Sequence, residues 1–269
     1  MPSVTLATVG DNCIDRFQPP VDLSVVGGNA VNVAVHLCRL GRDCAYFGAV
    51  GRDADGDRTI EMLEACGVVT DHIQRLDGVT AYTEITIDPI GDRIIGFEEF
   101  GVCRVYRPTD AEIALLSRMR HVHFGWMMGA EGLIARLRAA GVTVSKDTSV
   151  NPGAANLSIA FTSAQGTPDR ARAIAEGLLS EGAEIAVVTL GASGSLVMAG
   201  QEVRRTGIKP VTVVDTTGAG DTFIAGFLAR HLDGGSLSQC LDAGRDAAAE
   251  TCTYFGAFPQ TPLPVPPLS

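Results

Sequence analysis

The sequence lacks the features that mark nucleic-acid-binding and membrane proteins. Its formal net charge is −10, and only Lys146 and Lys209 among its 21 basic residues are lysines. Nucleic-acid binding needs a basic surface, which this acidic balance argues against. No apolar run approaches the ~20 residues that cross a bilayer, and residues 1–10 lack the basic start and apolar stretch of a signal peptide. We therefore expect a cytoplasmic protein that binds neither nucleic acid nor membrane.

Paired cysteines are also absent. The seven cysteines are scattered, odd in number and never spaced Cys-x-x-Cys. Disulfide frameworks and zinc sites need regular cysteine pairs, so reduced thiols are expected. Aromatic residues make up only 6% of the chain, yet 46% of its 269 residues are hydrophobic, which is ample for a core.

What the chain does contain is a regular alternation of strand-like and helix-like segments. This order predicts an α/β fold, a three-layer α/β/α domain with a mainly parallel central sheet and helices on both faces. With no separate linker, residues 1–269 are expected to form a single domain. Strands are expected at 4–9, 44–50, 120–124, 142–146, 159–162 and 184–190, a hairpin at 194–199 and 202–206, and helices at 29–40, 57–66, 128–140, 168–181, 219–232 and 237–251.

Residues 79–100 interrupt this alternation. Two β-rich runs, 79–87 and 93–97, flank Asp-Pro-Ile-Gly-Asp (88–92), which is typical of a hairpin turn. Together with residues 14–26, they predict a small β-sheet standing off the main sheet.

The segment Asp-Thr-Thr-Gly-Ala-Gly-Asp (215–221) is the most informative one. An apolar strand end runs into a flexible turn, and a helix then begins with Asp221 in its first turn. Amides at such a turn favour anions, so Gly218, Ala219 and Gly220 suit an anion hole, and an adjacent acid suits removal of a hydroxyl proton. Taken alone, the segment fits equally well a glycine-rich turn whose Asp caps a helix.

A second segment, Gly-Gly-Asn-Ala-Val-Asn (27–32), precedes the first helix. Asn29 and Asn32 would lie one turn apart on one face, where paired amides suit sugar hydroxyls. An ordinary Asn N-cap is the equal alternative. A Walker motif is absent, because Asp57-Arg58 stands where Lys-Ser/Thr is required. The pair His121 and His123 fits either a metal pair or polar packing on a strand, and we favour packing.

Together these segments resemble the ribokinase/PfkB carbohydrate kinase family. The segments 27–32 and 215–221 are similar to its two signatures, and Thr-Leu-Gly-x-x-Gly (189–194) is similar to the stretch that lies along ATP. Within the family the chain most resembles the fructoselysine 6-kinases, through residues 10–15 and 92–96 in particular.

The resemblance implies roles for particular residues. Asp221 would be the general base, beside an anion hole formed by Gly218, Ala219 and Gly220, and magnesium would accompany ATP. The small sheet would be a lid over the sugar and a possible homodimer contact. Sugar contacts are implied for Asp11, Asp15, Gly28, Asn29 and Asn32, nucleotide contacts for Ser163, Thr189, Gly191, Gly194 and Gly220, and a monovalent-cation (K⁺) site for Asp215 and Thr217 with the backbone near Gly256.

One segment departs from the family pattern. The usual Asn-x-x-Glu reads Ser-Ala-Gln-Gly at 163–166, and the Ser is in keeping with the fructoselysine kinases. The missing Glu leaves two arrangements for magnesium open, one through water and one in which Asp169 replaces the Glu.

We expect an ATP-dependent kinase for the 6-hydroxyl of fructoselysine or a related fructosyl amino acid. A kinase for a plain ketose or a nucleoside is the alternative, and a sugar-binding regulator without catalysis is the non-enzyme alternative. A lysine moiety would need an acid for its ammonium, for which Glu84, Glu98 and Glu99 of the lid are candidates.

Overall fold

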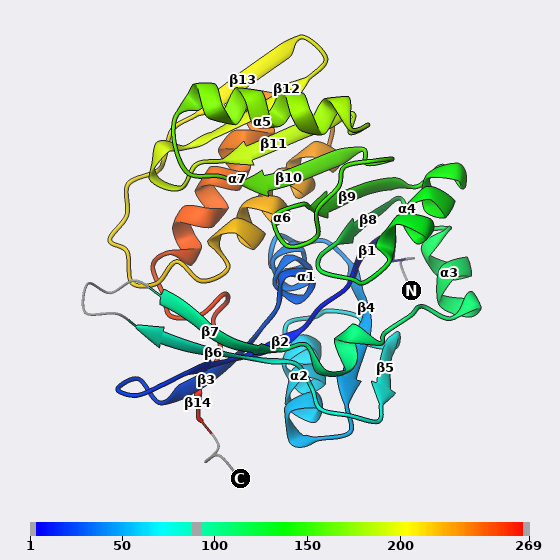
Figure 1. Ribbon diagram of the computed structural model, residues 1–269, viewed down its shortest axis with the longest axis vertical. Helices are drawn as coiled ribbons and strands as arrows, with labels where there is room; N and C mark the ends of the chain where they lie inside the picture. The colour runs from blue at the N-terminus through cyan, green and yellow to red at the C-terminus, as the bar shows by residue number, and fades with distance from the viewer. Residues whose placement is uncertain (1–3, 88–92, 266–269) are drawn as a thin grey trace.

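The computed structural model describes residues 4–87 and 93–265, and its main feature is a nine-stranded sheet (Figure 1). The strand order is β13-β12-β11-β10-β9-β8-β1-β4-β5; the pairs β11–β12 and β12–β13 are antiparallel, and all other pairs in this sheet are parallel. This confirms the predicted mainly parallel sheet. Its strands are β1 (Leu6–Val9), β4 (Cys44–Gly51), β5 (Ile73–Leu76), β8 (His121–Phe124), β9 (Thr143–Asp147), β10 (Ile159–Ser163), β11 (Ile185–Thr189), β12 (Ser195–Ala199) and β13 (Glu202–Thr206).

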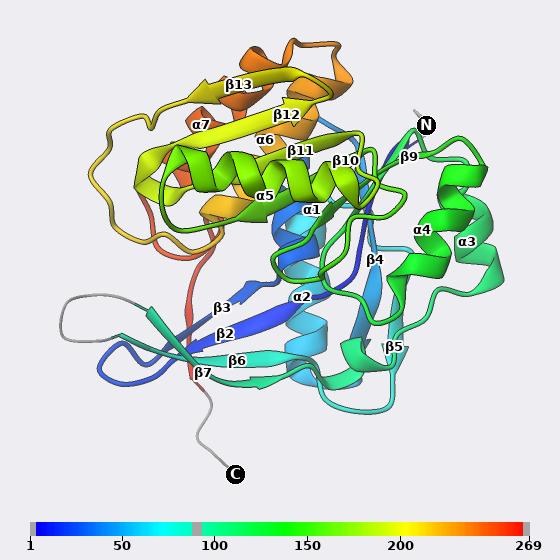
Figure 2. The ribbon, with the colours of Figure 1, turned by 45° about the horizontal axis from the view of Figure 1, so that its top comes forward.

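Helices cover both faces of this sheet (Figure 2). Side chains alternate between the faces along a strand, so Ala7 and Val9 of β1 enter one apolar core and Leu6 the other. Helices α3, α4 and α5 pack on the first core, and α1, α6 and α7 pack on the second. The helices are α1 (Asn29–Arg39), α2 (Ala54–Ala65), α3 (Asp110–Leu116), α4 (Ala130–Ala139), α5 (Pro168–Ser180), α6 (Ala219–Leu232) and α7 (Leu237–Thr251), with short 3-10 turns η1 (Gly101–Arg104) and η2 (Gly191–Ser193).

A second, five-stranded sheet stands off the first (Figure 1). Its order is β14-β3-β2-β6-β7, and only the pair β2–β6 is parallel. A small core of Phe17, Val25 and Ile85 lies on one face, where Phe255 packs on Phe17 with ring centroids 4.7 Å apart. The strands expected within 14–26 and 79–100 are thus present, and the turn expected at 88–92 lies outside the described residues. The strands are β2 (Cys13–Phe17), β3 (Leu23–Gly27), β6 (Tyr82–Ile87), β7 (Arg93–Glu99) and β14 (Leu263–Pro264).

Two local predictions need correction. The helix expected at 57–66 begins at Ala54, because the Asp53 carboxylate caps it by accepting a hydrogen bond from Gly56 N at 2.8 Å. Helix α3 was not predicted, although its capping box, Thr109 with Glu112, is readable in the sequence. Neither change moves the strands that carry the site.

His121 and His123 are polar residues packed inside the protein on strand β8. Both side chains are buried. His121 Nδ1 is hydrogen-bonded to the Thr143 hydroxyl, and His121 Nε2 and His123 Nδ1 to the Ser145 hydroxyl, at 2.8–2.9 Å. Across 4–87 and 93–265, no cluster of three or more potential metal-binding side chains occurs, and no helix is long and apolar enough to cross a membrane. The burial of both rings and their hydrogen bonds to strand hydroxyls agree with the favoured interpretation, polar packing on the strand.

Candidate active site

The candidate site lies along the carboxyl edge of the parallel strands. Asp11 follows β1, while Asp147, Ser163 and Thr189 are the last residues of β9, β10 and β11. From β1 the chain first adds β4 on one side and later β8 on the other, so the strand order reverses between β1 and β8. Ligands of open α/β sheets bind at such a reversal.

Asp11 holds the start of helix α1. Its carboxylate accepts hydrogen bonds from the backbone amides of Asn29 at 2.7 Å, Ala30 at 3.3 Å and Trp126 at 2.8 Å. The helix itself begins after Gly28 and has no side-chain cap of its own, so the expected alternative of an Asn N-cap is wrong. Because a remote carboxylate caps the helix, the Asn29 side chain is available to the site. Burial raises the pKa of Asp11, and these backbone hydrogen bonds lower it.

Asp221 lies between the two asparagines of α1. Asn29 Nδ2 donates to Asp221 Oδ1 and Asn32 Nδ2 donates to Asp221 Oδ2, each at 2.6 Å. The two amides therefore share one helix face, as the sequence predicts. The N-cap of α6 is Gly218, not Asp221, so Asp221 is more than a capping residue.

The turn before Asp221 requires glycine. Gly218 has φ +69°, in the left-handed region, and a Cβ on it would overlap the side chain of Ala257. The tight packing fixes the first turn of α6, where Ala219 and Gly220 line the cavity described below. The Ala219 amide also donates a long hydrogen bond to Thr216 O, at 3.3 Å.

Asp147 is a site residue that the sequence did not reveal. Asn29 Nδ2, besides holding Asp221, donates to Asp147 Oδ2 at 2.9 Å. Burial raises the pKa of Asp147, and the hydrogen bonds from Ser149 lower it. Its position directly after a buried strand at the carboxyl edge is the signal that could have identified it.

The electrostatics of the site hold Asp221 as a weak acid. Burial is the largest cause and raises the pKa of Asp221 well above its usual range, while the hydrogen bond from Asn32 lowers it. The charges of Asp147, Asp11 and Asp15 raise this pKa further. No ion pair between described residues involves Asp11, Asp147 or Asp221. A carboxylate whose pKa is raised is suited to accept a proton at neutral pH.

Two acceptor atoms lie beside this carboxylate. Asn29 Oδ1 and Asn32 Oδ1 are buried and accept no hydrogen bond from any described residue. Buried polar atoms are normally hydrogen-bonded, so these oxygens suit the hydroxyl donors of a ligand. Asp15 approaches from the smaller sheet: its Oδ2 would lie 3.0 Å from a Cβ on Gly27, which in turn would lie 3.7 Å from Asn32 Oδ1.

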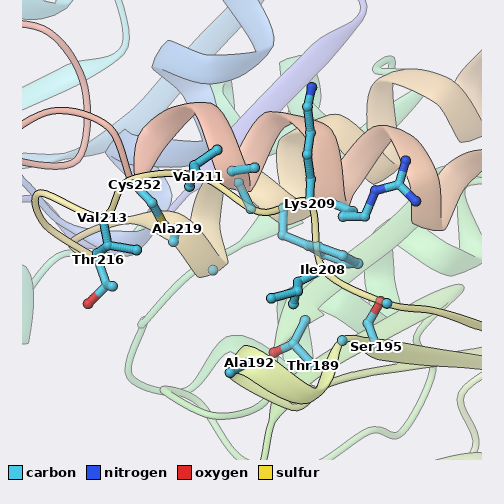
Figure 3. Close-up of a pocket in the computed structure, with 18 of the residues that line it drawn as sticks. Thr189, Ala192, Ser195, Ile208, Lys209, Val211, Val213, Thr216, Ala219 and Cys252 are labelled. Carbon is cyan, nitrogen blue, oxygen red and sulfur yellow. The ribbon is translucent and has the colours of Figure 1, made fainter.

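A cavity of about 480 Å³ adjoins the first turn of α6. Figure 3 shows Thr189, Ala192 and Ser195 on one wall and Val213, Ala219 and Cys252 on the opposite one. Of the predicted nucleotide contacts, the lining includes Thr189, Gly191, Gly194 and Gly220. Ser163 and Gly218 are not part of it.

Ser163 is connected to the carboxylates of the site instead. It is exposed at the end of β10, and its backbone amide donates to Ser149 Oγ at 2.7 Å. Ser149 N in turn donates to Asp147 Oδ1 at 2.9 Å. Asp169 is exposed in the first turn of α5, after the loop that follows β10. The roles of Ser163 and Asp169 stay predictions.

The three parts of the predicted cation site come together. Asp215 Oδ1 accepts from Thr217 N at 2.9 Å and from Thr217 Oγ1 at 2.7 Å, and Asp215 Oδ2 accepts from Gly256 N at 2.9 Å. These contacts tie the loop after α7 to the turn that leads into α6.

Comparisons with known proteins agree with this geometry. The model of the pfkB family carbohydrate kinases matches residues 23–109 and 143–264. The fructoselysine 6-kinase of Escherichia coli (strain K12) is 36% identical over 261 residues, covering 94% of this chain and 99% of that protein. The fructosamine kinase FrlD of Bacillus subtilis is 30% identical over 264 residues, covering 94% of this chain and 92% of that protein.

Solved structures share the fold. The ribokinase of Arabidopsis thaliana, complexed with ribose and ATP, superposes with a TM-score of 0.84 at 22% identity over 94% of both chains. A putative ribokinase II from E. coli, in complex with ATP and Mg²⁺, gives 0.76 at 22% identity over 95% of this chain and 94% of that one. The fold is therefore ribokinase-like.

Proposed function

Because the chain belongs to the pfkB family of carbohydrate kinases, we propose that it transfers the γ-phosphoryl group of ATP to the 6-hydroxyl of a fructosyl amino acid, fructoselysine first. The observation that carries this is Asp221, held by two amides at the start of α6, where the carboxylate site and the cavity meet. The fructoselysine 6-kinase at 36% identity and the fructosamine kinase at 30% support the substrate class.

In the proposed reaction Asp221 accepts the proton of the sugar hydroxyl. The hydroxyl oxygen bonds to the γ-phosphorus, the bond from this phosphorus to the β–γ bridging oxygen breaks, and ADP leaves. The Gly220 amide and the N-terminal end of the α6 dipole stabilise the negative charge on the transferring group, together with the Ala219 amide, which also donates to Thr216 O at 3.3 Å. Gly218 shapes this hole through its left-handed conformation.

Sugar binding divides between the lid and α1. Asp15, Gly28, Asn29 and Asn32 hold the sugar, and the two buried amide oxygens accept its hydroxyl protons. Asp11 acts as a positioning residue, because its carboxylate is engaged by three backbone amides at the start of α1 and after β8. The lid excludes water, which limits ATP hydrolysis without sugar.

ATP occupies the cavity lined by Thr189, Gly191 and Gly194, and Mg²⁺ accompanies it. The ion needs only one or two protein carboxylates besides phosphates and water. It does not require a cluster of three metal-binding side chains, and residues 4–87 and 93–265 contain none. Asp147 and Ser163 are the oxygen donors at this edge that suit it. The ion supplies neutralisation of phosphate charge.

A monovalent cation such as K⁺ binds near Asp215, Thr217 and the backbone of Gly256 in this proposal. It would fix the loop after α7 against the first turn of α6 and so the anion hole. We expect K⁺ to raise the rate of ADP release and Asp215→Asn to lose this stimulation. Equal rates in potassium and tetramethylammonium salts would exclude the site.

The proposal treats residues 1–269 as one kinase domain in which the smaller sheet is the lid. It also includes a homodimer that forms through this lid. In the described sheet β7 is an edge strand, and Ile94 and Phe97 on it are more than half exposed. Such an edge favours pairing with a second copy. Light scattering should give twice the 28.1 kDa mass of the chain; a monomer at micromolar concentration would contradict the dimer.

A substrate panel tests the reaction. ADP release is measured with fructoselysine, other fructosyl amino acids, fructose and nucleosides, and the phosphorylated carbon is identified by NMR. We expect fructosyl amino acids to give the highest kcat/KM and phosphate on the 6-oxygen. If fructose or a nucleoside exceeded every fructosyl amino acid, the alternative kinase would be correct. If sugars bound without ADP release, the chain would be a regulator.

A further inference from the structure

We propose that Glu98 on the lid binds the ammonium group of the substrate's amino-acid moiety and so selects fructosyl amino acids over plain ketoses. This rests on the proposed function and assigns the part of the substrate that the sugar-binding residues do not reach.

The register of the lid strands places Glu98 in line with the sugar site. Asp15 of β2 pairs with Thr83 of β6, and Thr83 pairs with Glu98 of β7. Paired residues on adjacent strands project from the same face of a sheet. Asp15, Thr83 and Glu98 therefore form one row across three strands.

This row begins inside the site. The Asp15 carboxylate approaches Gly27 and the Asn32 side chain, as described above, and its charge helps to raise the pKa of Asp221. Thr83 is buried, with its Oγ1 3.0 Å from Cys13 Sγ. Glu98 is exposed. The row thus runs from the buried sugar site outward to solvent, where an amino-acid moiety extending from the sugar would lie.

The spacing matches a lysine side chain. Adjacent strands lie about 4.8 Å apart, so the backbone of β7 is roughly 10 Å from that of β2. The two nitrogens of an extended lysine are separated by five carbons, roughly 7 Å at ~1.5 Å per bond. When the fructosyl group is bound by Asp15, the glycated nitrogen lies one bond beyond the sugar. The extended lysine then brings its free α-ammonium close to the Glu98 carboxylate.

The next row supplies an apolar surface for the methylene groups. Phe17 pairs with Ile85, and Ile85 pairs with Ile95. A register shift between Thr83 and Ile85 keeps Ile95 and Glu98, three residues apart, on the same face. Ile95 is 61% exposed, so its side chain is accessible to a ligand's hydrocarbon chain.

The other two acids of the lid have different surroundings. Glu84 is the cross-strand neighbour of Arg16, and both lie on the opposite face of the sheet. The Arg16 guanidinium there lies 3.9 Å from the centre of the Tyr82 ring and forms an ion pair with Asp55. Glu99 Oε1 accepts a hydrogen bond from Gly101 N at 2.8 Å. The Glu98 carboxylate has no hydrogen-bond or ion-pair partner among residues 4–87 and 93–265. Only Glu98 thus combines the site face with an uncommitted charge.

The test compares Glu98→Gln with Glu84→Gln, a matched change on the opposite face. KM and kcat are measured for fructoselysine and for its analogue with a butylamine in place of lysine, which lacks the α-ammonium. We expect Glu98→Gln to raise KM for fructoselysine about 10-fold, the factor expected for one charge-assisted contact, with kcat unchanged. Neither the analogue nor Glu84→Gln should show this rise.

Each failure has its own signature. If the unaltered enzyme phosphorylates no fructosyl amino acid, the proposed function is wrong. If it does so, yet Glu98→Gln changes KM for fructoselysine no more than Glu84→Gln does, only the role of Glu98 is wrong. An equal rise of KM for fructoselysine and for the butylamine analogue would also overturn it, because the effect would then not involve the ammonium.

Discussion

The cavity proposed for the nucleotide and the carboxylate site proposed for the sugar lie on the same sheet edge, yet their charges are opposite. Among the described residues that line the cavity none is acidic, and two, Lys209 and Arg245, are basic. The proposed sugar site gathers Asp11, Asp15, Asp147 and Asp221, and the charges of the first three raise the pKa of Asp221. A protein of net charge −10 thus keeps carboxylates away from the place proposed for a polyanion.

The first turn of α6 joins the two regions. Ala219 and Gly220 line the cavity, and Asp221 faces the two asparagines of α1. The amides proposed to stabilise an anion and the carboxylate proposed to accept a proton are therefore only one or two residues apart. The difference between the regions shows that the fold separates charge locally: the first turn of α6 presents Ala219 and Gly220 to the cavity and Asp221 to the asparagines, although the chain as a whole is acidic.

The largest effect should come from removing the proposed base alone. Asp221→Asn should lower kcat about 10³-fold, because general base catalysis contributes on this order, and leave the affinity for ATP unchanged. ADP-release kinetics and nucleotide titration measure both. A variant with normal turnover, or one that loses ATP binding, would remove the distinction between the two regions.

The same variant has a stability signature. Burial raises the pKa of Asp221 in the folded protein, so the stability that this group contributes is greatest at low pH and is lost as the pH rises through the raised pKa. Asn carries no charge at any of these pH values. At pH 8 the thermal midpoint of Asp221→Asn should equal or exceed that of the unaltered protein, whereas a fall that grows with pH would contradict the raised pKa.

Distorting the first turn of α6 should affect both regions. Gly218→Ala places a Cβ against Ala257 in a left-handed conformation, which should destabilise the fold by about 1–3 kcal/mol and lower kcat about 10²-fold. Gly220→Ala is the control for stability, because its Cβ would meet no atom within 4 Å. Thermal unfolding and ADP release separate the two effects, and equal stability of both variants would contradict the strain at Gly218.

A charge added to the cavity should affect only the binding of the nucleotide. Val213 and Val214 are similarly exposed, 60% and 62%, but only Val213 lines the cavity. Val213→Asp should raise KM for ATP about 10-fold, since it puts a carboxylate on an apolar wall next to a polyanion. Val214→Asp should have little effect. Similar KM values for the two variants would show that ATP does not occupy this cavity.

The smallest effect concerns the pH profile. The charge of Asp147 is one cause of the raised pKa of Asp221, after burial. Asp147→Asn should therefore let Asp221 lose its proton at lower pH, shifting the acidic limb of kcat/KM for the sugar to lower pH. Glu176→Gln, on the exposed face of α5, is the control and should leave the limb in place. A limb that moves to higher pH would contradict the repulsion between the two carboxylates.

Sequence patterns were sufficient where the signal is local. The alternation of strands and helices, the two asparagines one turn apart and the acid in the first turn of a helix are set by neighbouring residues, through periodicity and turn chemistry. The segments 27–32 and 215–221 could be identified in this way before any contact between them was known.

Only the tertiary structure decided which residues meet. Asn29 and Asp221 are 192 positions apart. Asp147, which accepts a hydrogen bond from the Asn29 side chain, belongs to neither of the two segments. Strand order brings the ends of β1 and β9 together, and strand register decides that Glu98, not Glu84, shares a face with Asp15. Composition and local pattern carry no information about order or register, because both are fixed by pairing between distant strands. The sequence by itself thus determined the elements and the acid at the start of α6, and the packing of the sheets determined its partners.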